Sequence, residues 1–359
     1  MNANTSRQSP AEHEDGTELF SRTARDLPAG RHQFHKERLM AQIQQEQHVP
    51  TAAPVKPRRT RLVRPAIALP VLATAVAGAF VAVSLMHGQE APGGLGTGPA
   101  LTTPVGAAST EGLPQLVDRI ALAAAEESHP KVGPGQYIYI ESRGAGTFVK
   151  TVGDKSSLVG QDLHTRQIWE SADGTQGWLI DPAVNDDPEG ETLSLPDEQG
   201  NTPEATLNAP SYDYLAELTT DPDELLAKIY AETEGMGNSP DQQAFTTIGD
   251  LLGESYPPAK LYPALFKAAA KIPGVVVVND AVDAVGRHGV AVARLDEHGG
   301  VREEWIFDKK THVFLGERSV QVSGSSGEDG LIKPGTVIST SAVMKRAIVD
   351  GLKETPSGE

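Results

Sequence analysis

The 359-residue sequence predicts an α+β chain with an N-terminal tail, one membrane-spanning helix, and a C-terminal domain of curved, mostly antiparallel sheet with inserted helices. Two observations predict this. An uncharged apolar run occupies residues 65–86, and the chain beyond it changes from strand-like to helix-like periodicity and back again. Strands, then helices, then strands are typical of an α+β domain.

The apolar run is 22 residues long, and a helix of that length reaches about 33 Å, enough to cross a hydrocarbon core of about 30 Å. Four arginines stand on its N-terminal side, and no Lys or Arg follows it until Arg119. The positive-inside rule therefore places residues 1–64 in the cytoplasm, with a flexible stalk over 87–112 and a domain over 113–359 outside. The topology-setting arginines are Arg58, Arg59, Arg61 and Arg64, and the predicted transmembrane residues include Pro65, Ala66, Leu72, Phe80 and Met86.

Three other readings of the run fit less well. A secretory signal peptide has a shorter apolar segment close to the N-terminus, whereas this run starts after 64 residues. A lipoprotein signal needs a cysteine, and the chain has none. A soluble helix is apolar on one face, whereas this run is apolar all round. An uncleaved signal anchor in the cell membrane is therefore expected.

Charge divides at the apolar run. Residues 1–64 carry 11 Lys and Arg against 7 Asp and Glu, which leaves 20 against 41 in the rest of the chain. A strongly acidic exterior repels nucleic acid and anionic lipid, so we expect neither as its partner. The absence of cysteine excludes disulfides, thiolate nucleophiles and iron–sulfur ligation.

The tail predicts two short helices, over residues 17–26 and 31–47, separated by the breaker Leu27-Pro28-Ala29-Gly30. Such short helices do not bury a core of their own. They either dock on a cytoplasmic partner or stay partly disordered, and the composition fits both. An apolar stripe that such a partner would contact consists of Phe34, Leu39, Met40 and Ile43.

The domain begins with a predicted helix over 113–128, because apolar residues recur there at helical spacing. Strand-like segments follow at 136–142 and 148–149. An Asp173-Gly174 turn between the runs 166–170 and 177–180 predicts a β-hairpin.

After an acidic, proline-rich loop over 181–210, two helices are expected to start at Asp221-Pro222 and Ser239-Pro240, each a cap followed by a proline. A third is expected over 258–271. A β-meander then covers residues 274–279, 289–296, 301–308 and 312–320, with a last strand near 336–343.

Segments Ala24–His32 and Lys36–Met40 of the tail, with Tyr137–Tyr139, Trp169 and Trp178 of the domain, resemble an actinobacterial family of signal-anchored envelope proteins. The family has no established activity. Its genes often accompany extracytoplasmic-function sigma factors, so the resemblance implies a regulatory role and a sigma factor as partner. The strand–helix–strand order is also similar, at fold level, to the half-barrel of periplasmic lipoprotein carriers and a related sigma-pathway sensor, which is an analogy.

No motif predicts a metal site or a cofactor. His32 and His35 share a helix face but have no further ligand, and the acidic segment 185–191 lacks the alternating spacing of a calcium loop. We therefore interpret the two histidines and the acidic segment as solvated polar residues.

Catalytic motifs are also missing from the sequence, so no catalytic residue is predicted and the chain is not expected to be an enzyme. His288, His298 and His312 fall in or beside turns. Glu303 and Glu304 do not form a catalytic pair, since neighbours on a strand point to opposite faces.

Six aromatic residues of the predicted strands either line a cleft or fill the core, and core is the commoner role of such residues. They are Tyr137, Tyr139, Trp169, Trp178, Trp305 and Phe307. Two functions follow. One is a regulatory or sensing protein whose outer domain is coupled to a cytoplasmic partner in an anti-sigma-like manner. The alternative is an envelope binding or carrier module for a lipid, lipoprotein or glycan, with an elongated apolar cavity between the sheet and the helices at 222–271.

Overall fold

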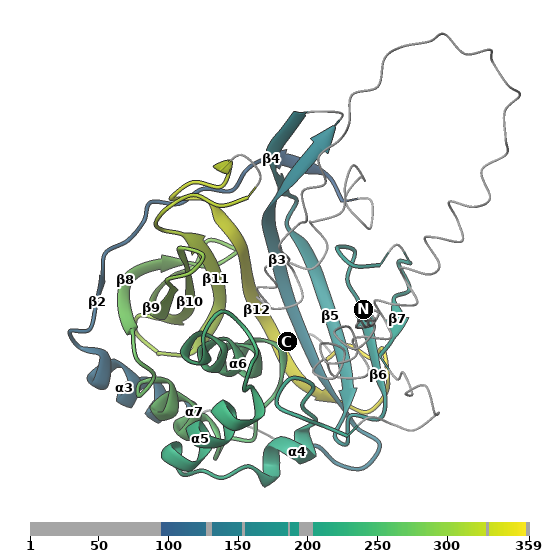
Figure 1. Cartoon of the computed structure of the whole chain (residues 1–359). Coiled ribbons are helices and arrows are strands. Elements are labelled where there is room, and N and C mark those ends of the chain that lie inside the picture. Colours follow the sequence, from purple (N-terminus) through teal and green to yellow (C-terminus); the bar gives the residue numbers. More distant parts are fainter. Residues whose placement is uncertain are drawn as a thin grey trace, which may run out of the picture. The chain divides into compact units, whose positions relative to one another are not determined.

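The computed structural model describes residues 95–126, 131–152, 155–185, 187–193, 204–327 and 330–356. These residues form a curved sheet with helices gathered on one side (Figure 1). The strands are β1 (Thr97–Pro99), β2 (Ala108–Ser109), β3 (Tyr137–Val152), β4 (Lys155–Gln161), β5 (His164–Ser171), β6 (Gly177–Ile180), β7 (Glu191–Thr192), β8 (Val275–Val282), β9 (His288–Asp296), β10 (Val301–Asp308), β11 (Phe314–Gln321) and β12 (Val337–Val349). The helices are α3 (Leu113–Glu126), α4 (Tyr212–Glu217), α5 (Pro222–Glu232), α6 (Pro240–Glu254) and α7 (Tyr262–Ala269).

The strands follow the order β2-β8-β9-β10-β11-β12-β3-β5-β6-β7, and β4 joins β1 to β3. Each ladder between these strands is antiparallel. The predicted class, a curved antiparallel sheet with inserted helices, is confirmed for this part of the chain. The meander β8–β11 and the hairpin β5–β6 were both expected from the sequence, and Gly174 takes the positive φ of 73° that its turn needs.

The pairing of β12 with β3 unites the two halves of the sheet. It runs from Val349 opposite Tyr137 to Ser339 opposite Gly146, with a register shift between Val343 and Lys345. The strand nearest the C-terminus thereby lies beside a strand from the start of the domain (Figure 1). This pairing makes one domain of strands that are separated by the helical insertion.

The helices start where their caps predict. The Asp221 carboxylate accepts hydrogen bonds from the amides of Asp223 and Glu224, and the Ser239 hydroxyl accepts one from Gln242. Each cap satisfies amide groups that have no partner within the helix. The predicted helix at 258–271 is present as the shorter α7, because residues 258–261 form a separate turn, in which the amide of Leu261 donates to the carbonyl of Pro258.

The main core lies between the helices and the inner face of the sheet. At its centre the rings of Phe245 on α6 and Trp305 on β10 are stacked, with centroids 3.9 Å apart and planes 7° apart. Both residues are essentially inaccessible to solvent. Helix α6 is thus fixed against the sheet by aromatic packing.

The part of the predicted stalk that the structure describes is bound to the domain. Strand β1 pairs with β4, β2 pairs with β8, and the carbonyl of Gly106 accepts a hydrogen bond of 3.0 Å from Arg302. The expectation of a flexible stalk is therefore wrong for residues 95–112, because backbone pairing, which leaves no periodic apolar pattern in the sequence, holds this segment to the domain. Among the described residues no helix is long and apolar enough to span a membrane; the predicted span 65–86 lies outside them.

Candidate functional site

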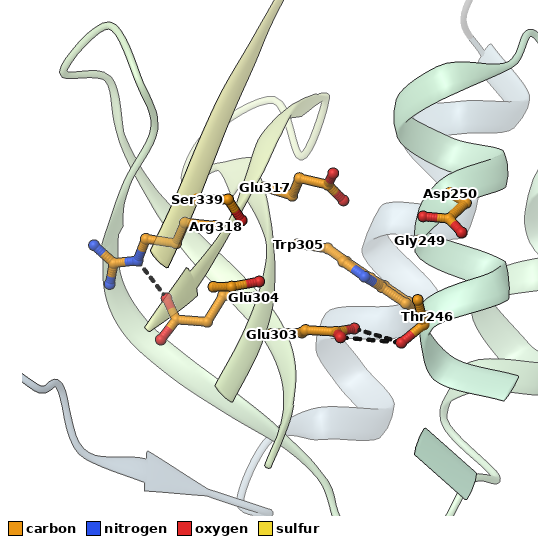
Figure 2. Close-up of a pocket in the computed structure, with 10 residues that line it drawn as sticks. Thr246, Gly249, Asp250, Glu303, Glu304, Trp305, Glu317, Arg318 and Ser339 are labelled. Carbon is orange, nitrogen blue, oxygen red and sulfur yellow. Dashed lines mark hydrogen bonds and ion pairs between the residues drawn. The ribbon is translucent and has the colours of Figure 1, made fainter. Parts of the chain in front are cut away.

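A small pocket opens between α6 and strands β10 and β11 (Figure 2). Its volume of about 30 Å³ is the share of a single water molecule. The lining is mostly polar and comprises Thr246, Gly249, Asp250, Glu303, Glu304, Trp305, Glu317, Arg318, Ser319 and Ser339. We call this the acidic pocket.

Strand alternation and helix register place its inner side chains. Glu303 and Trp305 share the face of β10 that meets α6, and Glu317 stands opposite Trp305 on β11. From α6, the hydroxyl of Thr246 lies 3.0 and 2.9 Å from the two carboxylate oxygens of Glu303 (Figure 2). Gly249 lets the helix approach closely, since a Cβ there would lie 2.5 Å from the indole Nε1 of Trp305.

The inner carboxylates hold their protons more tightly than free glutamate does. Burial raises the pKa of Glu303 to about 7, against the opposing effect of hydrogen bonds from Thr246 and Gln242. Burial, together with the charges of Glu254 and Glu303, raises the pKa of Glu317 to about 8. Two carboxyl groups of one pocket therefore change charge near neutral pH.

A third such group extends the row along the inner face. The pKa of Glu170 on β5 is raised to about 7, chiefly by burial. The charge of Arg166 opposes this rise, and the charge of Glu254 adds to it. Glu254, at the end of α6, thus acts electrostatically on carboxylates of both β5 and β11. The sequence did not single out Glu170, Glu254 or Glu317, because they come from three distant segments. For Glu170 and Glu317 the only signal was their position, as charged residues at inward points of the strand alternation, whereas Glu254 ends a helix.

Glu304 points to the other face of the sheet, as expected. Its two carboxylate oxygens each accept a hydrogen bond of 2.7 Å, one from Arg302 and one from Arg318. All three side chains are buried beneath the segment that joins β1 to β2. Although both residues line the acidic pocket, the carboxylate of Glu304 belongs to a structural ion network on the other face, whereas the carboxylate of Glu303 faces α6.

A larger cavity, of about 240 Å³, lies beneath β12 on the helix side. We call it the β12 groove. It is lined by Ile120 and Ala124 of α3, Tyr262 and Phe266 of α7, Phe307 of β10, Arg287 of the turn before β9, and the two segments His312–Leu315 and Val343–Arg346.

The six predicted aromatic residues do not line one cleft. Trp305 and Phe307 lie in the core beside the helices. Tyr139 and Trp169 pack against each other on the outer face, with centroids 5.1 Å apart, and Trp169 donates a hydrogen bond to the carbonyl of Glu354. Tyr137 and Trp178 adjoin this outer cluster, and the Lys353 ammonium lies 3.8 Å from the ring centre of Trp178. The C-terminal segment 350–356 thus covers outer aromatics.

The three histidines that the sequence placed in or beside turns, His288, His298 and His312, are not brought together with the acidic loop. His288 lies 3.3 Å from an exposed Asp280, the amide of His298 donates to Asp296, and His312 lines the β12 groove. Asp187, in the acidic loop, accepts a hydrogen bond from the amide of Glu189. No group of three or more His, Asp or Glu in the described ranges is arranged to hold a metal ion.

The remaining candidate residues belong to the segments before residue 95, outside the described part of the chain. They are the tail stripe (Phe34, Leu39, Met40, Ile43), the four arginines (Arg58, Arg59, Arg61, Arg64) and the predicted span (Pro65, Ala66, Leu72, Phe80, Met86). Comparison of the whole chain with protein-family models, curated proteins and solved structures found no match.

Proposed function

We propose that the chain is a single-pass membrane protein that couples a non-enzymatic sensing domain outside the membrane to a partner in the cytoplasm. The observation that carries the proposal is the uncharged run 65–86, with four arginines on one flank and a folded domain on the other. This asymmetry favours a cytoplasmic tail and an extracytoplasmic domain.

The geometry of the domain favours sensing over catalysis. The acidic pocket has room for one water and not for a substrate. Its carboxyl groups, Glu303 and Glu317, lie between α6 and the sheet and change charge near neutral pH. A change of charge at that contact alters how well the helix packs, which is the kind of two-state element that a sensor requires.

A tail of 64 residues is longer than an anchor needs. Its apolar stripe, Phe34, Leu39, Met40 and Ile43, suits a helix that docks in a groove of a partner protein. The resemblance described above makes a sigma factor the first partner to test.

The alternative, a carrier of lipids, lipoproteins or glycans, has less support. Sites for drug-sized ligands usually enclose about 300–1,000 Å³. The β12 groove is smaller, at about 240 Å³, and the centre of the space between sheet and helices is filled by Phe245 and Trp305.

The test is deletion of residues 1–47 in the native host, with transcription measured across the genome. We expect the transcriptional effect of the protein to be lost while its amount in the membrane stays unchanged. A sharper variant replaces Leu39 and Ile43 with Asp, and its matched control replaces Gln42 and Gln44 with Asp. A transcriptome that responds to neither the deletion nor the stripe variant would overturn the regulatory role.

A further inference from the structure

The β12 groove combines apolar walls with positive charge in an acidic domain. Residues 65–359 carry 20 Lys and Arg against 41 Asp and Glu, yet no Asp or Glu is among the residues that line the groove. Its lining includes three cationic side chains: Arg287, Lys345 and Arg346. A local positive field within a negative domain suggests a site for an anion.

Two of the three cations are already engaged. The guanidinium of Arg287 forms an ion pair of 2.6 Å with Asp283 and donates to the carbonyls of Leu315 and Val343. Lys345 donates to the carbonyl of Pro356. Arg287 therefore has a carboxylate as counter-charge, whereas the Lys345 ammonium has a backbone carbonyl as its partner.

Arg346 is different. Within the described part of the chain no carboxylate pairs with its guanidinium, and its buried Nε has no hydrogen-bond partner. The side chain is held in place, since one terminal nitrogen donates to the carbonyl of Leu252 and the guanidinium lies 5.7 Å from the ring centre of Phe314. A fixed, unbalanced cation at the wall of a cavity is preorganised for an anionic partner.

Aromatic and aliphatic side chains form most of the remaining wall of the groove. Phe307 packs edge-to-face with both Phe266 and Phe314, at centroid distances of 5.6 Å. Val313 and Met344, at the rim, are 38% and 43% exposed and rank among the exposed large hydrophobic residues of the described chain. The register shift between Val343 and Lys345 bends β12 at this point, and such bulges redirect side chains beside binding sites.

We propose that the β12 groove binds a small amphipathic monoanion: a carboxylate that pairs with Arg346, on an apolar body that fills the aromatic walls. The cavity of about 240 Å³ equals roughly eight water volumes, which suits a body of about eight carbons. This inference deepens the proposed function by naming the ligand class of the sensing domain.

The experiment titrates the full-length chain, held in phosphatidylcholine nanodiscs, with octanoate and with 3-phenylpropionate by isothermal titration calorimetry, and empty discs serve as the blank. The two acids separate an alkyl from an aryl body. We expect saturable binding of at least one of them, and binding at least tenfold weaker for octanol and for acetate, which lack the charge or the body. Absence of saturable binding by both acids, or equal binding of octanol, would overturn the proposal.

Variants assign the site. Arg346→Gln is expected to weaken binding at least tenfold and Arg346→Lys to restore part of it. The matched control is Arg143→Gln, since Arg143 also has a buried Nε without a partner but does not line the groove. Because Arg346→Gln also removes a contact with α6, Met344→Glu is the second test; at an exposed rim position it repels the anion without disturbing the core. Unchanged binding in Arg346→Gln and Met344→Glu would overturn the assignment.

The same experiment distinguishes failure of the proposed membrane topology from failure of the proposed ligand site. A chain that does not enter the nanodiscs contradicts the membrane span, and the titration then runs on the free chain. A chain that enters them and binds neither acid contradicts only the ligand site.

Discussion

Glu303 and Glu304 are neighbours on β10, but their carboxylates lie on opposite faces of the sheet in opposite electrostatic settings. Glu303 accepts hydrogen bonds from the neutral hydroxyl of Thr246, whereas Glu304 is held between the guanidinium groups of Arg302 and Arg318. Partly buried carboxyl groups thus lie on the inner face without a cation from the described residues bonded to them, whereas the buried carboxylate on the outer face is paired with two arginines. The two faces should respond differently to pH and to mutation.

The first prediction concerns pH. Since burial raises the folded-state pKa of Glu303 to about 7 and of Glu317 to about 8, the folded chain holds protons that the unfolded chain releases near pH 4.5. Their contribution to stability is complete below the unfolded pKa of 4.5, declines progressively above it, and is fully lost once the pH has passed the folded pKa values of about 7 and 8. The free energy of unfolding, measured in urea, should therefore fall as the pH rises from about 4.5 to about 8 and level off above that.

The double variant Glu303→Gln, Glu317→Gln should reduce this dependence, because neither amide ionises, and Glu170 accounts for a remaining slope. Glu297→Gln, at an exposed position in the β9–β10 turn, is the matched control and should leave the slope unchanged. An equal slope in the double variant and in the unsubstituted chain would contradict the account of the acidic pocket.

The second prediction uses two glycines of α6. A Cβ at Gly249 would lie 2.5 Å from the indole of Trp305, which the stack with Phe245 holds rigid. Gly249→Ala should destabilise the domain by about 1–3 kcal/mol through overpacking. At Gly253 the nearest atoms lie 3.6 Å away, so Gly253→Ala should be neutral or gain up to about 1 kcal/mol of helix propensity. Thermal unfolding of the two variants checks the difference; equal effects would contradict the close approach of α6.

The third prediction concerns the outer ion network. Glu304→Gln leaves the buried Arg302 and Arg318 without a counter-charge and should cost about 3–5 kcal/mol. Replacing all three residues with Met, Leu and Met should recover most of that loss, because no buried charge then remains. Lys228→Ala, in an exposed pair on α5, should cost less than about 0.5 kcal/mol. Denaturant titration compares the free energies of unfolding of the three variants. A triple variant that is less stable than Glu304→Gln would contradict this account.

Local chemistry explains which elements the sequence could predict. The caps at Asp221 and Ser239, the turn at Asp173-Gly174 and the alternation of β9–β11 are each encoded within a few residues. Strand β4 was not predicted, because its sequence Lys-Ser-Ser-Leu-Val-Gly-Gln has little apolar alternation. The strand pairs with β3 through backbone groups. The short helix α4, which lies between the predicted acidic loop over 181–210 and the cap at Asp221, was likewise not predicted.

The candidate site depended on contacts that no local pattern reports. The acidic pocket needs α6 to cross the strands that carry Glu303 and Glu317, and the β12 groove needs β12 to pair with β3. The sequence did indicate that the side chains of Glu303 and Glu304 would point to opposite faces of the sheet, because strand alternation is a local property. It gave no indication that Arg346 would lack a counter-charge, since this depends on which residues from distant parts of the chain come to lie near its guanidinium.

The last prediction concerns the orientation in the membrane, on which the tail-partner proposal depends. Proteinase K added to intact spheroplasts should cut between the predicted span and residue 95 and release a fragment that starts near that residue. We place the cut before residue 95 because β1 pairs with β4 from Thr97 onward, and paired backbone resists proteolysis. The tail should stay intact until the membrane is opened.

The arginines give the same prediction an independent test. Replacing Arg58, Arg59, Arg61 and Arg64 with Glu removes the charge bias and should lower or scramble insertion, whereas replacing them with Lys keeps the bias and should preserve it. An epitope at the N-terminus reports the outcome through its protection from protease. Should the tail of the unsubstituted chain be cut while the spheroplasts are still intact, the orientation is reversed, and the stripe at Phe34 to Ile43 has no access to a sigma factor.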